Sequence, residues 1–307
     1  MNIKNIVKNQ SIRHRLLRLF SWVPDSLMLP FQYYLILHRW CNIRNPRRFT
    51  EKIQSYKAFY RNEDMLTCVD KYLVRDFVKN RLGTDKYLNQ LYQVCDNADE
   101  IDFAALPEKF VIKTSDGGNG DNVFICKDKA SIDVEKVKEK VNSWKGRKLY
   151  AVSREWAYVG AKQSRIIVEQ FLSEGEGVDL KDYKFFCFNG VPHYCQLIQD
   201  RSTVETIDFY DMDWNIMPFY GLNPKVLPSG KPVAKPEGFE TMKEIAAKLS
   251  EGFPYARIDL YNIHGEIYFG EVTFYPASGY GIFTPDEWDF KFGNLMPNDS
   301  FIKNSGR

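Results

Sequence analysis

The chain has 307 residues, of which 44% are hydrophobic and 15% aromatic. This is enough to bury a large core, so the chain should fold without disulfides or a structural metal. Its six cysteines are scattered with no CxxC pair, and its four histidines lie far apart, which argues against a transition-metal site. We expect the cysteines to be reduced and mostly buried.

The net charge of +2 is unevenly distributed along the chain. Residues 1–50 contain nine Lys or Arg against one acid, Asp25, which gives +8 and leaves −6 for the remainder. This excess fits either a solvated helical face or a platform for anionic lipid headgroups or a polyanionic substrate. No nucleic-acid-binding motif accompanies it, so nucleic acid is not an expected partner.

No segment approaches the roughly 20 consecutive apolar residues that span a bilayer. The longest candidate, Leu27 to Leu37, is interrupted by Pro30 and Gln32. The first residues also lack the basic and then apolar pattern of a signal peptide. We therefore expect a cytoplasmic protein, with peripheral contact with the inner face of the membrane as one outcome of its basic segment.

Residues 1–100 are predicted to form a helical, basic N-terminal region. Apolar positions recur three to four residues apart between Val69 and Val78, and Gly83 follows as a C-cap. This region supplies helices rather than a nucleotide-binding sheet.

The β pattern begins in a small lobe that we place at residues 101–175. Two strands flank a glycine-rich loop, and a helix and a third strand follow. The expected elements are strands at 109–114, 122–126 and 165–172, and a helix at 134–144.

A larger lobe is expected over residues 176–307. It should begin with a hairpin that turns at Asn189-Gly190 and end with two strands that turn at Ile263-His264-Gly265, with a helix between them. The expected elements are strands at 182–188, 193–199, 256–261 and 267–274, and a helix at 239–249.

The first chemical motif is the glycine-rich loop that starts at Thr114-Ser115-Asp116-Gly117-Gly118. Such a loop lets backbone N–H groups approach phosphate oxygens, and Lys113 on the preceding strand can point its ammonium at the same anion. It is not a Walker loop, since GxxxxGK[ST] is absent. A purely structural hairpin tip remains the alternative.

Two further motifs suit a nucleotide cleft. Glu169 stands among apolar residues at the end of a strand, where the backbone of a hinge could bind an adenine edge. Asp182 and Lys184 share one face of their strand, which places a carboxylate for a ribose hydroxyl beside an ammonium for a phosphate. An ordinary edge strand and a plain ion pair are the respective alternatives.

The most informative motif lies near the end of the chain. Arg257 and Asp259 alternate on one strand, and Glu271 and Thr273 alternate on the strand paired with it. The short turn predicts that these faces lie side by side. Two carboxylates and a hydroxyl are hard oxygen ligands, which favour Mg²⁺ held jointly with substrate phosphates.

Taken in this order, the motifs between Lys109 and Pro276 resemble the ATP-grasp superfamily, whose members include D-alanine:D-alanine ligases and ribosomal-protein glutamate ligases. The Ala256-Arg257-Ile258-Asp259 strand with Glu271-Val272-Thr273 is similar to the arginine, aspartate and ExN metal motif of the superfamily. Asp182-Tyr183-Lys184 is similar to the DxR/K strand of the glutamate ligases.

A narrower resemblance covers most of the chain. Phe49-Thr50-Glu51-Lys52-Ile53, Asp70-Lys71 with Val74-Arg75, and the Thr114 to Gly118 loop resemble the TupA-like ATP-grasp family of surface-polysaccharide loci. Thr273 departs from the superfamily, which usually has asparagine there. This departure leaves open whether one or two Mg²⁺ ions bind.

The resemblance implies an α+β ATP-grasp fold, in which two lobes grip ATP. It implies an ATP-dependent ligase whose catalytic residues are Arg257 and Lys184, with Mg²⁺ as a cofactor. The implied ATP-binding residues are Lys113 and Lys184 for the phosphates, Asp182 for the ribose, Ser115, Gly117 and Gly118 in the loop, and Glu169, Gln170 and Leu172 around the adenine. Asp259, Glu271 and Thr273 are the implied metal ligands.

In the implied reaction a carboxylate becomes an acyl phosphate, which an amine converts to an amide. One partner would be an amino acid or a similar group, and the other a glycan or lipid-linked glycan of capsular or teichuronic type. An ATP-grasp kinase acting on an alcohol, a nucleotide-sensing module and a glycosyltransferase are the alternatives. The intact Lys113, Lys184, Asp259 and Glu271 argue against a non-catalytic module, and Asp211-Met212-Asp213 lies in a loop-like run unsuited to a nucleotide-sugar site.

Overall fold

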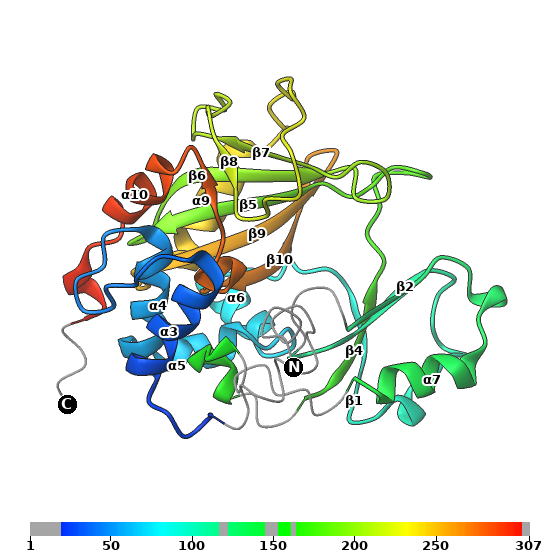
Figure 1. The fold of residues 1–307 in the computed structure, drawn as a ribbon. Helices are drawn as coiled ribbons and strands as arrows, with labels where there is room; N and C mark the ends of the chain where they lie inside the picture. The colour runs from blue at the N-terminus through cyan, green and yellow to red at the C-terminus, as the bar shows by residue number, and fades with distance from the viewer. Residues whose placement is uncertain (1–19, 117–121, 145–152, 161–163, 303–307) are drawn as a thin grey trace.

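The computed structural model describes residues 20–116, 122–144, 153–160 and 164–302. Two antiparallel sheets lie beside each other, and the segment after β4 (Ile166–Gln170) leads from one to the other at β5 (Asp182–Phe188) (Figure 1). Helices of the N-terminal part pack at one end of the larger sheet. Within the described residues, no helix is both long and apolar enough to cross a membrane.

Four helices lie between residues 25 and 82 of the region predicted to be helical. They are α3 (Asp25–Leu37), α4 (Phe49–Phe59), α5 (Glu63–Cys68) and α6 (Val74–Leu82). Gly83 caps α6 with φ of 71°, a left-handed conformation that favours glycine, which confirms the expected C-cap. The strand β1 (Leu91–Cys95) follows, near the end of the region predicted to be mainly helical, and this strand was not predicted.

The small lobe is a four-stranded sheet in the order β1-β4-β2-β3, where β2 is Phe110–Thr114 and β3 is Val123–Cys126. Helix α7 (Val134–Asn142) buries Val137 and Val141 in a core that it shares with this sheet. These elements confirm the strands and the helix predicted for this part of the chain.

The larger sheet has five strands in the order β10-β9-β5-β6-β7. Its strands besides β5 are β6 (Val191–Gln199), β7 (Thr206–Tyr210), β9 (Tyr255–Ile263) and β10 (Glu266–Thr273). Helix α9 (Phe239–Ser250) packs against β5, β6 and β9. Both predicted hairpins and the predicted helix are confirmed, whereas β7 was not predicted.

The remaining elements are short. Helix α10 (Glu287–Asn294) packs against α4, and β8 (Tyr220–Gly221) pairs with β11 (Phe283–Thr284). The 3-10 turns are η1 (Ala98–Glu100), η2 (Lys129–Ser131), η3 (Trp156–Gly160), η4 (Pro276–Gly279) and η5 (Asn298–Ser300).

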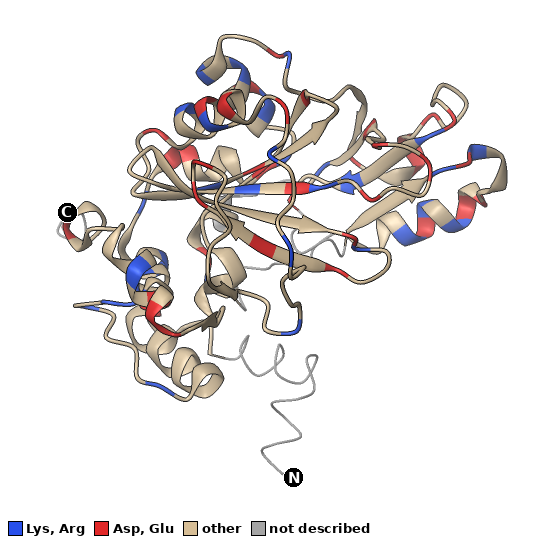
Figure 2. Ribbon diagram, turned by 90° about the horizontal axis from the view of Figure 1, so that it is seen from above, with Lys and Arg blue, Asp and Glu red and all other residues tan. Residues whose placement is uncertain are grey.

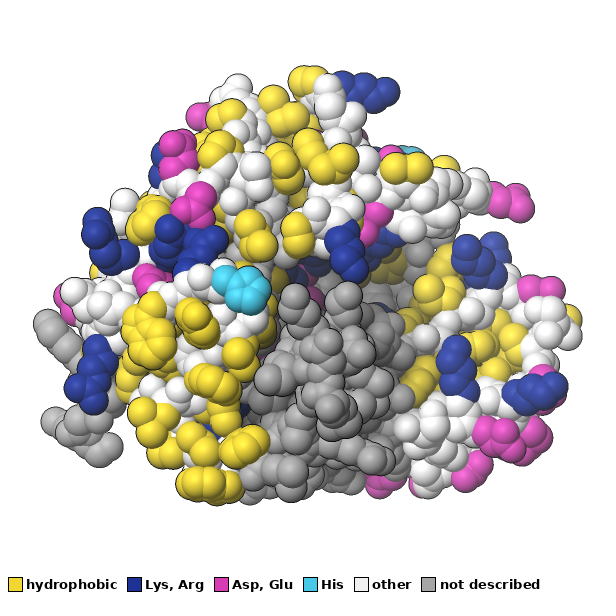
Figure 3. Space-filling model, in the orientation of Figure 1, with side chains coloured by type: hydrophobic (Ala, Val, Ile, Leu, Met, Phe, Trp, Pro, Cys, Tyr) yellow, Lys and Arg dark blue, Asp and Glu magenta, His cyan; other side chains and the backbone are white. Residues whose placement is uncertain are grey.

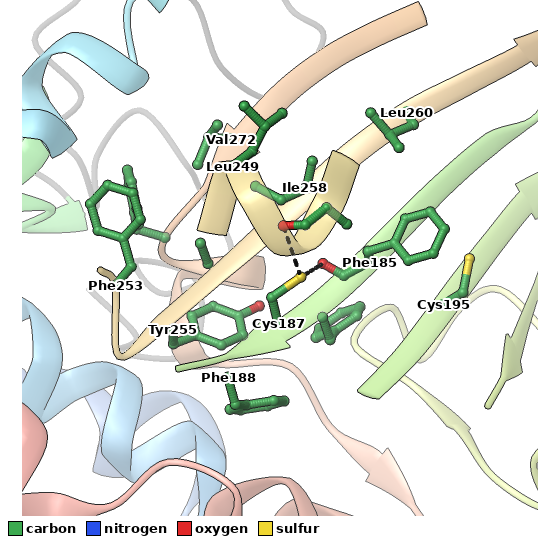
Figure 4. Packing of buried hydrophobic residues seen from close by; sticks show 14 of the residues in the cluster. Phe185, Cys187, Phe188, Cys195, Leu249, Phe253, Tyr255, Ile258, Leu260 and Val272 are labelled. Atoms are coloured by element: carbon green, nitrogen blue, oxygen red, sulfur yellow. Dashed lines mark hydrogen bonds between the residues drawn. The ribbon is translucent and has the colours of Figure 1, made fainter. Parts of the chain in front are cut away.

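The two faces of the larger sheet differ in character. Phe185 and Cys187 of β5 and Ile258 and Leu260 of β9 are completely buried on the side of α9. Cys187 lies with its sulfur 3.7 Å from the carbonyl oxygen of Ala246 in α9 (Figure 4). All six cysteines are free and buried, as expected. Because side chains alternate along a strand, the opposite face receives the charged residues of β5 and β9.

Candidate active site

Three neighbouring strands bring charged residues into one row across the larger sheet. Glu271 of β10 pairs with Asp259 of β9, and Asp259 pairs with Lys184 of β5. The next position of β5 on the same face is Asp182, which pairs with Tyr261. Acidic and basic positions accordingly follow one another on the central strands (Figure 2).

A β-bulge at Gly270 produces this row. The register of β10 with β9 shifts between Phe269 and Glu271, so Gly270 has no partner. Without that extra residue, Asp259 would pair with Gly270, and Glu271 would point to the opposite face. A Cβ at position 270 would lie 2.9 Å from the Asp259 carbonyl oxygen, which explains the glycine.

Arg257 is held by three of the residues around it. Its guanidinium donates to both carboxylate oxygens of Asp259, each at 2.7 Å, and to the Thr273 hydroxyl at 3.0 Å, and it lies 3.4 Å from Glu271. Lys184 donates to Asp259 and lies 2.9 Å from Asp182. The structure therefore brings together all six residues that the sequence placed on these strands.

Burial and the neighbouring charges shift the pKa values of this cluster in opposite directions. Although burial raises the pKa of Glu271, the charges of Lys184, Arg257 and Lys71 lower it to about 2. Burial also raises the pKa of the Asp259 carboxyl, and Arg257 and Lys184 act in the opposite direction. Burial acts to lower the pKa values of Arg257 and Lys184, but the charges of the neighbouring carboxylates outweigh it, so both pKa values are raised.

Asp182 has one free oxygen. Its Oδ2 accepts from Arg201 at 2.5 Å and lies near Lys184, whereas its Oδ1 is buried with no hydrogen-bond partner within the described part of the chain. A buried acceptor of this kind is unfavourable unless a donor such as a ligand hydroxyl reaches it. Arg201 was missed by the sequence analysis, since it stands in a polar turn with no recognisable motif.

The small lobe contributes a second ion pair. Lys113 of β2 donates to Glu169 of β4, and the lysine side chain is 25% exposed. Gln170 accepts from the Gln90 N–H at 3.2 Å, and Leu172 is half-buried in the segment after β4. Gly117 and Gly118 lie outside the described residues, so the glycine-rich loop stays a sequence-based prediction.

Ser115 ties this loop to the helical part. Its hydroxyl is buried, donates to Asp70 at 2.7 Å and accepts from the Arg165 N–H at 3.1 Å. The backbone N–H of Lys71 donates to the Ser115 carbonyl at 2.8 Å.

Lys71 is a candidate site residue to which the sequence analysis gave no role. Burial lowers the pKa of the Lys71 ammonium, and the charges that act on it are Glu271 of the larger sheet and Lys113, Glu169 and Asp116 of the small lobe. In the sequence, only the Asp70-Lys71 motif indicated that Lys71 belongs to the site.

The donor set is consistent with a hard cation. Asp259, Glu271 and Thr273 offer two carboxylates and a hydroxyl within one network. No group of three or more His, Cys, Asp or Glu in the described ranges is arranged to hold a metal by itself. Two carboxylates and a hydroxyl are the kind of ligand set that suits Mg²⁺, which commonly takes one or two carboxylates and completes its shell with phosphates and water.

The fold thus sets a four-stranded antiparallel sheet beside a five-stranded antiparallel sheet that carries the charged row. The model of the "TupA-like ATPgrasp" family matches residues 51–297, and the chain belongs to that family. The expected α+β ATP-grasp fold is thereby confirmed. A search of curated proteins finds no significant match to the sequence.

Solved structures give more distant likenesses. D-alanine–D-alanine ligase from Bacillus anthracis in complex with ATP is 16% identical with a TM-score of 0.45, over 78% of this chain and 66% of that one. D-cycloserine synthetase is 14% identical with a TM-score of 0.42, over 76% and 70%. Phosphoribosylamine–glycine ligase from Thermotoga maritima is 13% identical with a TM-score of 0.42, over 71% and 50%. The chain thus spans about two thirds of the length of the D-alanine–D-alanine ligase.

Proposed function

We propose that this protein is an ATP-dependent carboxylate–amine ligase that forms an amide through an acyl phosphate. The observation that carries the proposal is the guanidinium of Arg257, which Asp259 and Thr273 hold at the end of the charged row. A ligase needs a preorganised cation where a carbonyl oxygen becomes an oxyanion, and a rigidly held arginine supplies one.

The two sheets would hold ATP between them. Lys113 and Lys184 bind the phosphates in this proposal, and Oδ1 of Asp182, which has no partner among the described residues, accepts a ribose hydroxyl. The remaining nucleotide-binding residues are Ser115, Gly117 and Gly118 at the loop, and Glu169, Gln170 and Leu172 around the adenine. Lys113 would have to leave Glu169 to reach a phosphate, which a side chain that is 25% exposed can do.

Asp259, Glu271 and Thr273 would hold Mg²⁺, which would supply positive charge to the phosphates of ATP. Arg257 orients the substrate carboxylate and then binds the oxyanion that forms when the amine attacks. Lys184 stays charged between Asp182 and Asp259, and so supplies a permanent positive charge beside the transferring phosphoryl group.

We propose an amino acid or a similar small acid as one substrate and a glycan or lipid-linked glycan of surface-polysaccharide biosynthesis as the other. The support is the membership of the TupA-like family and the +8 charge of residues 1–50, which suits a polyanionic or lipid-linked partner. The corresponding place of action is the cytoplasm, next to the inner face of the membrane.

Hydroxylamine trapping tests the proposal. With ATP, Mg²⁺, hydroxylamine and a panel of amino acids and uronic-acid oligosaccharides, a ligase should convert one acid to a hydroxamate and release an equal amount of ADP. Arg257→Ala should slow this by roughly 10²-fold or more with ATP affinity little changed. Arg81→Ala is the matched control, because Arg81 lies at the surface beside Asp64.

A kinase would give a different product. If one of these compounds instead becomes a stable phosphorylated alcohol and no hydroxamate forms, the amide-forming proposal is wrong. Equal rates for Arg257→Ala and Arg81→Ala would remove Arg257 from the mechanism.

A further inference from the structure

Helix α3 carries apolar side chains on its outer face as well as on its inner face, and its polar Gln32 is buried. After Asp25 and Ser26 it contains no charged residue. Its inner face packs against the rest of the protein. Leu29 and Tyr33 are completely buried, and the Tyr33 hydroxyl lies 2.8 Å from the hydroxyl of Thr50 in α4. A helix with apolar side chains on both faces is normally covered on both, so the outer face requires an explanation.

The outer face of α3 is exposed. Leu27, Phe31, Tyr34 and Leu35 recur at helical spacing, and their exposed fractions are 66%, 54%, 49% and 43%. Phe20 and Trp22 precede the helix, and Trp40 follows it, with 73% exposure. We call this set, together with Ile36, the α3 patch; its apolar side chains gather at the lower left of the molecule (Figure 3).

The α3 patch differs from the other exposed apolar side chains. Among the described residues, 17 large hydrophobic side chains are exposed, and eight of them lie between positions 20 and 40. All five exposed aromatic residues are among those eight, whereas the other nine are aliphatic and scattered over the chain. A contiguous apolar patch of this kind marks an interaction surface rather than ordinary surface composition.

The charges around the patch point to an anionic partner. Asp25, the single acid of the first fifty residues, lies 2.7 Å from Arg154 and is thereby neutralised. Arg39 and Arg48 pair with Asp286, but Arg44 and Arg47 are exposed and form no ion pair within the described part of the chain. The exposed charges that follow the patch in sequence, Arg44 and Arg47, are thus basic, whereas the exposed acid Asp286 is paired with Arg39 and Arg48.

Exposed aromatic and aliphatic side chains followed by exposed arginines are the composition of a surface that lies in a membrane interface. Tryptophan and tyrosine prefer the headgroup level, leucine and phenylalanine reach the acyl chains, and arginine binds anionic headgroups. We propose that the α3 patch docks this protein on an anionic lipid surface. The inference extends the proposed function, because a lipid-anchored acceptor would be met at that surface.

Tryptophan fluorescence offers a test that needs no substitution. Of the six tryptophans, Trp22 and Trp40 are those in the α3 patch, with 78% and 73% exposure. Vesicles of phosphatidylcholine and phosphatidylglycerol that carry brominated acyl chains should quench their emission, and vesicles of phosphatidylcholine alone should quench it far less. Quenching should be present without ATP and should weaken as salt rises.

Substitutions then locate the contact. Leu27→Ser together with Phe31→Ser should lower the vesicle partition coefficient by about tenfold or more, since both side chains lose apolar contact with the acyl region. The matched control is Ile125→Ser together with Val204→Ser, because these exposed aliphatic residues lie outside the patch. Circular dichroism should show both double variants folded.

Three outcomes would overturn the proposal. The first is emission that brominated vesicles leave unchanged, and the second is equal vesicle binding by the two double variants. The third is a lipid-free dimer of the wild type that Leu27→Ser with Phe31→Ser dissociates, which would assign the patch to a second copy of this chain. Hydroxamate formation is measured without vesicles, so a failure of the ligase proposal and a failure of this one can be told apart.

Discussion

Lys113 and Lys184 are both proposed to bind phosphate, but their surroundings differ, so the effect of a substitution on ATP binding is easier to interpret at Lys113. Lys184 is 10% exposed between two nearly buried carboxylates, Asp182 and Asp259. Truncating one partner of a buried ion pair leaves an uncompensated charge and costs about 3–5 kcal/mol of stability. Loss of ATP binding in a Lys184 variant could therefore come from lost contacts with ATP or from unfolding. Among the described residues, Lys113 has only Glu169 as an ion-pair partner, and its side chain is more exposed.

Lys113→Ala should weaken Mg-ATP binding by about 1.5–3 kcal/mol, the size of a charge-assisted hydrogen bond to an anion. Isothermal titration calorimetry measures it. Lys109→Ala, an exposed lysine just before the same strand, should leave the affinity unchanged. If both variants bind ATP as the wild type does, Lys113 does not contact the phosphates.

Individual residues could be predicted where strand periodicity alone decides their direction. Two such pairs are Asp182 with Lys184 and Arg257 with Asp259. The members of each pair are two residues apart on a strand, so they share a face independently of the tertiary contacts. Arg201 and the Asp70–Ser115 hydrogen bond could not be predicted, because they join segments that only tertiary packing brings together.

At the scale of elements, the bulge at Gly270 decides which face carries Glu271 and Thr273. A regular hairpin with the same turn would separate these residues from Asp259. The sequence analysis placed Glu271 and Thr273 on the same face as Asp259, as the structure does. The two-residue period of a regular strand does not explain this placement. A glycine inside a strand pattern was the available signal for a bulge.

Gly270→Ala should destabilise the protein by about 1–3 kcal/mol, because its Cβ would lie 2.9 Å from the Asp259 carbonyl oxygen and the backbone would have to move. Urea denaturation measures the free energy of unfolding. Glu266→Ala is the control, since Glu266 is exposed on the same strand. A Gly270→Ala protein as stable as this control would mean that the bulge tolerates a side chain.

Some elements depend on contacts that no local pattern reveals. Helix α10 contains Gly293 and several aromatic residues, which are weak helix formers. It is held because Asp289 accepts from the Thr50 N–H at 2.9 Å and from the Thr50 hydroxyl at 2.8 Å. Gly293 lets the helix approach α4 closely, since a Cβ there would lie 2.2 Å from the Arg47 carbonyl oxygen.

For the whole molecule, helix α4 connects the N-terminal part to the end of the charged sheet. The turn η4 follows β10 directly, and Ala277 and Ser278 in it have φ of 46° and 52°, a conformation that non-glycine residues rarely adopt. Gln54 of α4 donates to the Ser278 and Gly279 carbonyls at 3.1 and 3.0 Å. The helical part therefore holds the chain just beyond Glu271 and Thr273 in a strained shape.

Lys57 of α4 completes this support from a fully buried position. Its ammonium donates to the Ser153 carbonyl at 3.0 Å, to the Ser278 carbonyl at 2.8 Å and to the Ser278 hydroxyl at 2.7 Å. Burial lowers the pKa of Lys57 to about 8, although the charges of Glu155 and Asp25 raise it. The folded protein thus releases this proton at a lower pH than an unfolded chain, in which lysine titrates near 10.5.

Between these two pKa values the unfolded state binds more protons, so the Lys57 contribution makes stability increase with pH. The Lys57 contribution to the free energy of unfolding does not change with pH below about pH 8. Above it, this contribution increases by about 1.4 kcal/mol per pH unit, to a total of about 3 kcal/mol.

The Lys57→Met substitution removes this pH-dependent contribution. Urea denaturation at pH 7.5, 8.5 and 9.5 should show the wild type gaining stability relative to Lys57→Met as pH rises. The control is Lys136→Met, which replaces an exposed lysine, and its free energy of unfolding should differ from that of the wild type by the same amount at each pH. A constant offset for Lys57→Met as well would mean that Lys57 stays protonated in the fold, held by Glu155 more strongly than burial opposes it.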